Sequence, residues 1–264
     1  KGADVVIHLA AEHQDYGISE KEYFQVNQIG TRNLLESATE CGIKKFIFYS
    51  SVAVYGIHKT ASHENFDPQP DNHYGSSKLA AEHEVRNWVK KSDTNQAIII
   101  RPSVVFGPEM NDYSNIFRLI DQIAKRKFAL VGKLRNIKSL AYVQNLVEAT
   151  AFMMNDFKDP LVLFNYADMP HLTSKEIIDN IMKSLGISFL PRLPYLITMM
   201  FAVIIDLIGK LLGVNFPLTA ARIKKLNTPT EHDGSFIKSL GFQATQSIEE
   251  GLIETTEWYK SRSK

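Results

Sequence analysis

The chain has 264 residues, and its 30 Lys and Arg nearly balance its 29 Asp and Glu. This length allows one large α/β domain or two unequal lobes, with a core that needs neither disulfides nor a metal. A net charge of +1 without a long basic block argues against a protein that binds nucleic acid by neutralising phosphates. A single cysteine, Cys41, excludes an internal disulfide framework. Because no signal peptide precedes the first apolar run either, we expect a cytoplasmic protein.

Short apolar runs alternate with amphipathic segments through the first half. We expect helices at 19–41 and 74–90 and strands at 4–9, 45–49, 97–101 and 161–166. The first helix has Val26, Gly30, Leu34 and Ala38 at four-residue spacing and should end at Gly42. Apolar strands alternating with helices indicate an α/β fold, a doubly wound parallel sheet covered on both faces. Ligands of such sheets bind beyond the carboxyl ends of the strands, here at 8–13, 50–53 and 102–107.

The second half loses this rhythm and is punctuated by prolines, which indicates a smaller, mostly helical lobe. Its apolar segment 195–212 is interrupted by Asp206 and Lys210, and the uninterrupted part is too short to span a bilayer. We expect a buried or lobe-capping helix here. A helix that binds a membrane surface or a partner stays open as the alternative.

The sharpest chemical signal is Tyr74-Gly-Ser-Ser-Lys78. Residues four apart lie on one face of a helix, so the phenol and the ammonium point the same way. A neighbouring cation favours the phenolate, and such a pair can exchange a proton with a substrate hydroxyl. A chance surface pair is the alternative for this pattern taken alone. Ser50 and Ser51 leave the preceding strand and offer hydroxyls for the same oxygen, or they merely end the strand.

These residues lie within a longer resemblance to the extended short-chain dehydrogenase/reductase family, the NAD-dependent epimerase/dehydratase group. The matching stretches occur in family order and cover nearly the whole chain: DVVIHLAA (4–11), VNQIGTRNLL (26–35), KKFIFYSSVAVYG (44–56), YGSSKLAAE (74–82), RPSVVFGP (101–108), KSLAYVQNLVEA (138–149) and LGFQATQSIEEGL (240–252). The resemblance implies a Rossmann-type dinucleotide-binding lobe at 1–105 and 143–170, and a substrate-binding lobe at 106–142 and 171–264.

The resemblance also implies roles for individual residues. Tyr74 is the acid/base, Lys78 lowers its pKa and holds the nicotinamide ribose, and Ser51 binds the reacting sugar oxygen, with Ser50 as the fallback. The residues expected to line the cofactor are Leu9, Ala10, Ala11, Asn27, Ser50, Tyr74, Lys78, Pro102 and Val104. Substrate contacts are expected from His13, Ser51, Asn115 and Arg135, with Asn136 and Lys138 near the nucleotide end. The scattered histidines predict no metal site.

Two departures from the family pattern stand out. The Gly-rich phosphate loop is not found, and the chain begins at what resembles the fourth strand, so we expect about 60 further residues to precede it. The residue that distinguishes NAD from NADP would lie there, so NADP is not excluded. Asn145 stands where the family often has aspartate.

The resemblance favours one reaction class. Val52-Ala53 follow Ser51 where sugar dehydratases have an Asp-Glu pair, so dehydration is disfavoured. We therefore expect 4-epimerisation or 4-keto reduction of a UDP- or dTDP-linked hexose by a homodimer using NAD, away from membranes. A hydroxysteroid-type dehydrogenase with a membrane-associated helix and a non-catalytic NAD(P)-sensing protein are the alternatives.

Overall fold

The computed structural model describes residues 2–14, 17–58, 60–155, 158–212 and 219–262. The chain forms two compact units. The first comprises Lys1–Val105, Ala141–Met169 and Glu231–Thr245, and the second comprises Phe106–Leu140, Pro170–Thr230 and Gln246–Lys264. The lobes expected from the sequence differ from these units at 231–245, a segment that we expected in the substrate-binding lobe. This segment carries α9 (Ser235–Ser239), whose Ile237 joins the core of the first unit.

The first unit is built on a parallel sheet with the strand order β1-β2-β3-β8. The strands are β1 (Val5–His8), β2 (Lys45–Tyr49), β3 (Gln96–Pro102) and β8 (Leu161–Tyr166). In the register of the inner strands, Ile47 lies opposite Ile98. The four predicted strands are therefore confirmed, and β3 extends one residue further at each end than expected.

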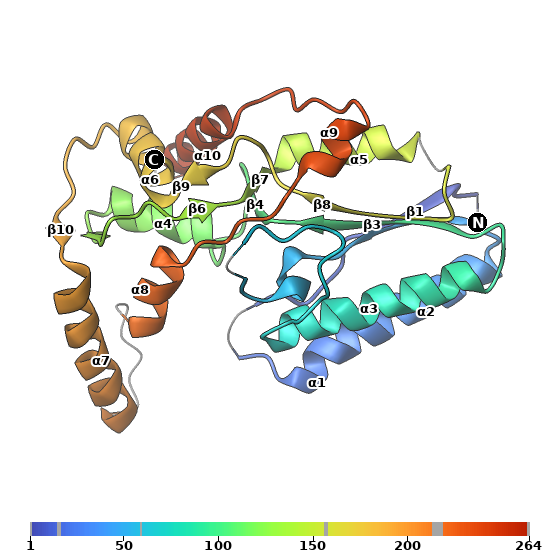
Figure 1. Ribbon diagram of the computed structural model, residues 1–264, viewed down its shortest axis with the longest axis horizontal. Coiled ribbons are helices and arrows are strands. Elements are labelled where there is room, and N and C mark those ends of the chain that lie inside the picture. The colour runs from blue at the N-terminus through green and yellow to red at the C-terminus, as the bar shows by residue number, and fades with distance from the viewer. Residues whose placement is uncertain (1, 15–16, 59, 156–157, 213–218, 263–264) are drawn as a thin grey trace. The chain divides into compact units, whose positions relative to one another are not determined.

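Alternate residues of the strands point to opposite faces, and helices cover both (Figure 1). Phe46, Phe48 and Ile99 pack against α2 (Gly30–Glu40) and α3 (His73–Lys90). Ile47, Ile98 and Ile100 face the other way, toward α5 (Val143–Met154) and α9. Burial on both faces explains why these strands read as continuous apolar runs, and the α/β fold is confirmed.

The helix predicted at 19–41 contains a wide turn that the sequence pattern did not reveal. Its parts are α1 (Glu20–Tyr23), the π-helix η1 (Phe24–Ile29) and α2. Ser19 and Glu22 form a reciprocal capping box at the start, and Gly42 follows the end with a φ of 75°. Of the four residues at the predicted four-residue spacing, Val26 is 43% exposed, Gly30 and Leu34 are half-buried, and only Ala38 is buried. The buried side consists of Tyr23, Asn27, Thr31, Leu35 and Ala38.

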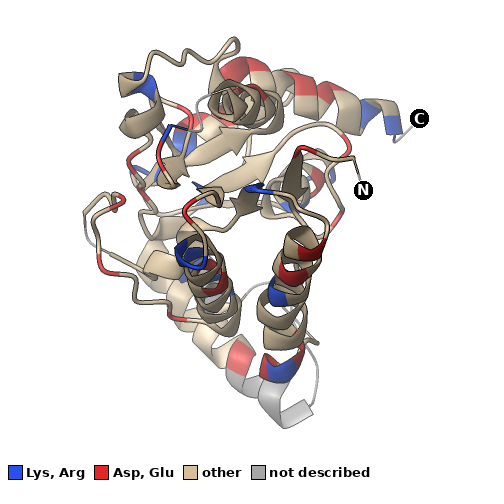
Figure 2. Cartoon of the chain, turned by 90° about the vertical axis from the view of Figure 1, so that its right-hand side faces the viewer, with Lys and Arg blue, Asp and Glu red and all other residues tan. Residues whose placement is uncertain are grey.

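Helices α2 and α3 lie side by side and carry charges of both signs on their outer surfaces (Figure 2). Arg32 on α2 and Glu84 on α3 form an ion pair with an N–O distance of 2.6 Å. Gln28 donates a further hydrogen bond to Glu84 at 2.9 Å. These polar contacts join the outer sides of two helices whose inner sides pack on the sheet.

The second unit is mostly helical, as expected. It contains α4 (Asn115–Ala124), α6 (Ser174–Ser184), α7 (Tyr195–Leu212), α8 (Ala220–Asn227) and α10 (Ile248–Arg262). Two strand pairs connect them: β5 (Leu130–Val131) with β10 (Arg192–Leu193), and β6 (Ile137–Lys138) with β9 (Leu172–Thr173). Helix α10 packs against α6 and α4, and Tyr259 donates a hydrogen bond to Asp121 at 2.8 Å. None of the helices in the described ranges has both the length and the apolar character that crossing a membrane requires.

Candidate active site

The segments that follow β1, β2 and β3 all leave the same edge of the sheet, because the three strands are parallel. After β1, Leu9 is 60% exposed and Ala10 is also exposed, although both are apolar. Small and apolar side chains at this edge let a flat ligand approach the backbone closely. The predicted cofactor lining at Leu9, Ala10 and Ala11 therefore lies at an open strand end.

Asn27 fixes the segment after β1 in place. Its side-chain oxygen accepts from the Glu12 amide at 2.7 Å, and its nitrogen donates to the Glu12 carbonyl at 3.0 Å and to Ser77 at 2.9 Å. The side chain is buried, with 1% exposure. The polar atoms of Asn27 therefore hold Glu12 and Ser77, and its role at the cofactor stays a prediction.

The two serines after β2 have different roles. Ser50 is buried and donates its hydroxyl to Glu82 at 2.6 Å. Ser51 precedes the 3₁₀-helix η2 (Val52–Tyr55), and its oxygen accepts from the Ala53 amide at 3.1 Å. The Ser51 hydroxyl donates to no residue in the described part of the chain, so its proton is available to a ligand. The choice of Ser51 over Ser50 for the reacting oxygen stays a prediction.

Helix α3 begins close to Ser51, and Gly75 makes the approach possible. Asn72 caps the helix by accepting from the Gly75 amide at 2.8 Å. A Cβ on Gly75 would lie 2.4 Å from the Ala53 carbonyl oxygen, so only glycine fits there. The first turns of α3, which carry Tyr74 and Lys78, therefore pack directly on η2. The ring of Tyr74 also lies 6.3 Å from that of Tyr23.

Lys78 is a buried cation whose surroundings suit a ligand. It is 1% exposed, and its Nζ lies 4.3 Å from the centre of the Phe48 ring. Burial lowers its pKa to about 7, although Glu82 acts in the opposite direction. Nζ has no hydrogen-bond acceptor among the described residues. Such an ammonium fits a ligand that supplies oxygens, as the ribose hydroxyls of a dinucleotide do.

His8 is a further buried titratable group at this end of the sheet. Burial and the charge of Lys78 lower its pKa to about 4, so the ring is neutral at pH 7. Thr31 donates its proton to the Asn27 carbonyl at 2.6 Å. The 2.9 Å contact between His8 Nε2 and Thr31 therefore has the ring as donor, which assigns the Nε2–H tautomer. A neutral His8 adds no second positive charge beside Lys78.

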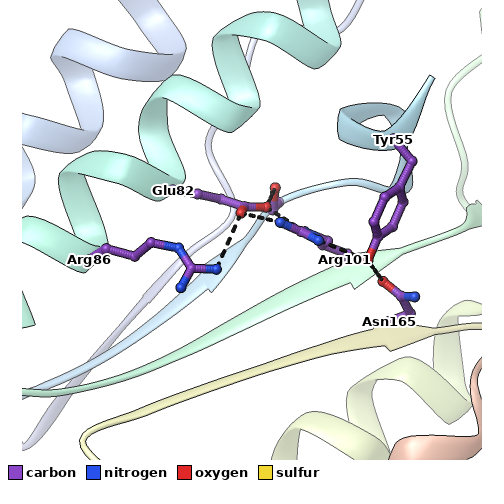
Figure 3. A network of polar contacts seen from close by, with 6 residues as sticks. Tyr55, Glu82, Arg86, Arg101 and Asn165 are labelled. Carbon is purple, nitrogen blue, oxygen red and sulfur yellow. Dashed lines mark hydrogen bonds and ion pairs between the residues drawn. The ribbon is translucent and has the colours of Figure 1, made fainter. Parts of the chain in front are cut away.

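A buried polar network lies behind the site and joins α3 to the sheet (Figure 3). Arg101 at the end of β3 donates to both oxygens of Glu82, from Nε at 2.8 Å and from Nη2 at 2.6 Å. Its Nη1 donates to the hydroxyl of Tyr55 at 2.8 Å, and Tyr55 donates to Asn165 at 2.8 Å. Sequence reasoning missed this network. No local spacing in the sequence signals it, because Glu82 and Arg101 belong to different elements.

The segment that follows β3 is the third of the three that leave this edge of the sheet. Pro102 is buried, and Val104 at the start of β4 (Val104–Phe106) is 37% exposed. Between them, the Ser103 hydroxyl is buried without a hydrogen-bond partner in the described residues. An orphaned buried hydroxyl at a ligand-binding edge is a candidate ligand contact, and it was not predicted from the sequence.

The predicted substrate residues divide between the units. His13 is exposed on the segment after β1, whereas Asn115 and Arg135 are exposed in the second unit and keep their roles as predictions. Asn136 donates to the carbonyls of Leu226 and Thr228 and to Ser174, at 2.9–3.2 Å. Lys138 donates to the carbonyls of Lys225 and Thr228. The donors of Asn136 and Lys138 thus bond carbonyl groups at and just after the end of α8.

The contacts of Asn145 explain why this position carries an amide. It donates to Asp168 at 3.0 Å, and the same carboxylate accepts from the Tyr142 amide and from the Tyr166 hydroxyl. Burial raises the pKa of Asp168 against the effect of these donors. An aspartate at 145 would place a second carboxylate against a buried one, so the amide suits this position. Over the described ranges, no group of three His, Cys, Asp or Glu residues forms a metal site.

Comparison with known proteins adds to this geometry. The model of the NAD dependent epimerase/dehydratase family matches residues 1–165. The N-acetyl-alpha-D-glucosaminyl-diphospho-ditrans,octacis-undecaprenol 4-epimerase of Escherichia coli O157:H7 is 37% identical over 97% of this chain and 78% of its own length. The UDP-glucose 4-epimerase of Vibrio cholerae is 28% identical over 97% of this chain and 77% of its own. The structure of a UDP-glucuronic acid 4-epimerase from Bacillus cereus with NAD superposes with a TM-score of 0.77, at 24% identity over 100% of this chain and 76% of that one.

Proposed function

Since the chain belongs to the NAD dependent epimerase/dehydratase family, we propose that it inverts C4 of a hexose carried on a diphosphate, with NAD as its cofactor. The observation that carries this proposal is the 37% identity, over nearly the whole chain, to an epimerase named for a sugar on undecaprenyl diphosphate. The carrier we favour is therefore a polyprenyl lipid. This choice revises the UDP or dTDP expected from sequence, although all three carriers share the diphosphate.

Each residue then has a defined task at the sugar. Tyr74 accepts the proton of the C4 hydroxyl and later returns it, and the Lys78 ammonium stabilises the phenolate while it holds the cofactor ribose. Ser51 donates its free hydroxyl to the same C4 oxygen. NAD, when bound, supplies the hydride chemistry at C4. Glu82 and Arg101 hold the helix and strand that carry these groups.

Epimerisation fits the site better than dehydration does. By the resemblance, sugar dehydratases have an Asp-Glu pair where Val52 and Ala53 begin η2, and neither of these residues carries a carboxyl group. A second candidate carrier is UDP, which the likeness to the Vibrio cholerae UDP-glucose 4-epimerase supports at lower identity. A homodimer, expected from the resemblance, stays a proposal.

The test is an epimerisation assay of the full-length protein with NAD. The substrates are N-acetylglucosamine on a prenyl diphosphate and on UDP, and the released sugars are separated by chromatography. We expect the 4-epimer to form faster from the prenyl-linked sugar. Tyr74→Phe should lower turnover by about 10²–10⁴-fold while dinucleotide binding changes only a few-fold. No epimer from either substrate, or a Tyr74→Phe variant with wild-type turnover, would contradict the proposal.

A further inference from the structure

Helix α7 has two apolar sides, and only one of them is packed. Thr198 and Ala202 are buried, and Ala202 joins Val131 and Ile223 in a small core of the second unit. Helix α8 lies against this packed side (Figure 1). The sequence predicted a buried or lobe-capping helix, and among residues 195–206 the structure buries only this side.

The opposite side is apolar and open to solvent. At 100° per residue, its members cover about 160° of the helix circumference. They are Leu196 at 76% exposure, Ile197 at 54%, Met200 at 68%, Phe201 at 61%, Val203 at 54% and Ile204 at 51%, and we call them the outer face of α7. Single exposed apolar residues are ordinary, but six on adjoining positions of one helix indicate a surface that another apolar phase covers.

The charges of the segment that contains α7 and α8 indicate which apolar phase covers the outer face. Residues 187–228 contain five Lys and Arg against one Asp, a net charge of +4. The whole chain has a net charge of +1, so the rest carries −3. The one acid, Asp206, accepts a hydrogen bond from the Ala220 amide at 3.0 Å at the start of α8. Lys224 and Lys225 are exposed on α8, and Arg192 is exposed on β10, just before α7.

We infer that the outer face of α7 lies in the interface of an anionic lipid bilayer, parallel to its surface. Apolar side chains enter the boundary between headgroups and acyl chains, and the surrounding cations bind the anionic headgroups. A second copy of the chain fits less well, because a symmetric contact would bring two regions of charge +4 together. This inference rests on the proposed function in one respect: a polyprenyl-linked sugar resides in a bilayer.

Sedimentation with vesicles tests the inference directly. The full chain is mixed with vesicles containing phosphatidylglycerol or only phosphatidylcholine, and the bound fraction is measured at low and high salt. Leu196→Glu/Phe201→Glu alters the outer face. Val147→Glu/Ile253→Glu is the matched control, since these residues are 54% and 39% exposed on other helices and the added charge is equal.

We expect binding to the anionic vesicles that salt weakens. The outer-face variant should bind at least about tenfold more weakly, and the control should stay within about twofold of the wild type. Equal binding by the two variants, or no vesicle binding by the wild type, would overturn the inference. So would sedimentation velocity in which the outer-face variant dissociates a dimer while vesicles have no effect.

A second measurement separates this inference from the proposed function. The same preparations are assayed on N-acetylglucosamine diphosphate linked to a short, water-soluble prenyl chain. The outer-face variant should keep wild-type turnover of this substrate and a wild-type circular dichroism spectrum. Turnover without vesicle binding in the wild type contradicts only the membrane inference. Vesicle binding without turnover contradicts only the proposed function.

Discussion

Replacing Arg101 by Gln should unfold the first unit far more easily than replacing Arg86 by Gln, although both arginines face the same carboxylate. Arg101 is 2% exposed, Glu82 is fully buried, and the two share a bidentate pair with an N–O distance of 2.6 Å at its shorter contact. The side chain of Arg86 is 35% exposed and lies 4.0 Å from Glu82. The two substitutions therefore remove a buried, close arginine and a more exposed, distant one from the same carboxylate.

The expected magnitudes follow from what each change leaves behind. Without Arg101, the buried carboxylate keeps the Ser50 hydroxyl, a distant Arg86 and the charge of Lys78, and Tyr55 loses one of its partners. Removing one partner of a buried pair costs about 3–5 kcal/mol of unfolding free energy. Losing an exposed pair costs less than about 1 kcal/mol. The double variant Glu82→Gln/Arg101→Gln should recover part of the loss, because no charge is then buried alone.

Urea unfolding followed by tryptophan fluorescence measures this difference. Trp88 lies in the core of the first unit and Trp258 lies in the second, so a Trp258→Phe background makes the signal report on the first unit. Unfolding free energies that agree within about 1 kcal/mol for Arg101→Gln and Arg86→Gln would refute the assignment of Arg101 as a buried structural cation.

Three further predictions concern pH and binding. Lys78→Met should stabilise the cofactor-free protein most at and below pH 7. Folding lowers the pKa of Lys78 from 10.5 to about 7, so between these pH values the lysine is protonated in the unfolded chain and neutral in the folded one. The gain over the wild type in urea unfolding should shrink by about 1.4 kcal/mol per pH unit above pH 7, and a constant difference would contradict it. Arg135→Ala should weaken binding of a diphosphate-linked sugar by about 1.5–3 kcal/mol in calorimetry, whereas Lys133→Ala should not. Asn145→Asp should destabilise the protein by about 1–3 kcal/mol at pH 7 and less at pH 5, where a proton shared with Asp168 restores the hydrogen bond, and thermal unfolding at both pH values checks the sign.

The sequence predicted the strands of the first unit well because each is buried on both faces. Runs such as Phe46–Phe48 and Ile98–Ile100 are short and continuously apolar, which is typical of the strands of a parallel sheet covered on both faces. The positions of Tyr74 and Lys78 on one helix were also predictable, since their spacing depends on local geometry alone.

The parts that the sequence did not predict depend on contacts between distant segments. The pairing of Glu82 with Arg101 joins a helix to a strand, and no local spacing indicates it. The hydrogen bond from Ser50 to Glu82 likewise joins the end of a strand to a helix. Asn136 and Lys138 look like anion ligands in sequence, but the end of α8 uses their donors.

The π-helical turn of η1 sets how far α1 is rotated about the helix axis relative to α2. Tyr23, Asn27, Thr31 and Leu35 are buried at steps of four residues. In an ideal α-helix, three such steps rotate by about 120° away from the starting line, which would carry Asn27 or Leu35 out of the interior. The wider turn absorbs part of this drift. A deletion of one residue within 24–29 would therefore turn the helix N-terminal to it by about 100° relative to α2, whereas a deletion beyond Gly42 would leave the phase unchanged.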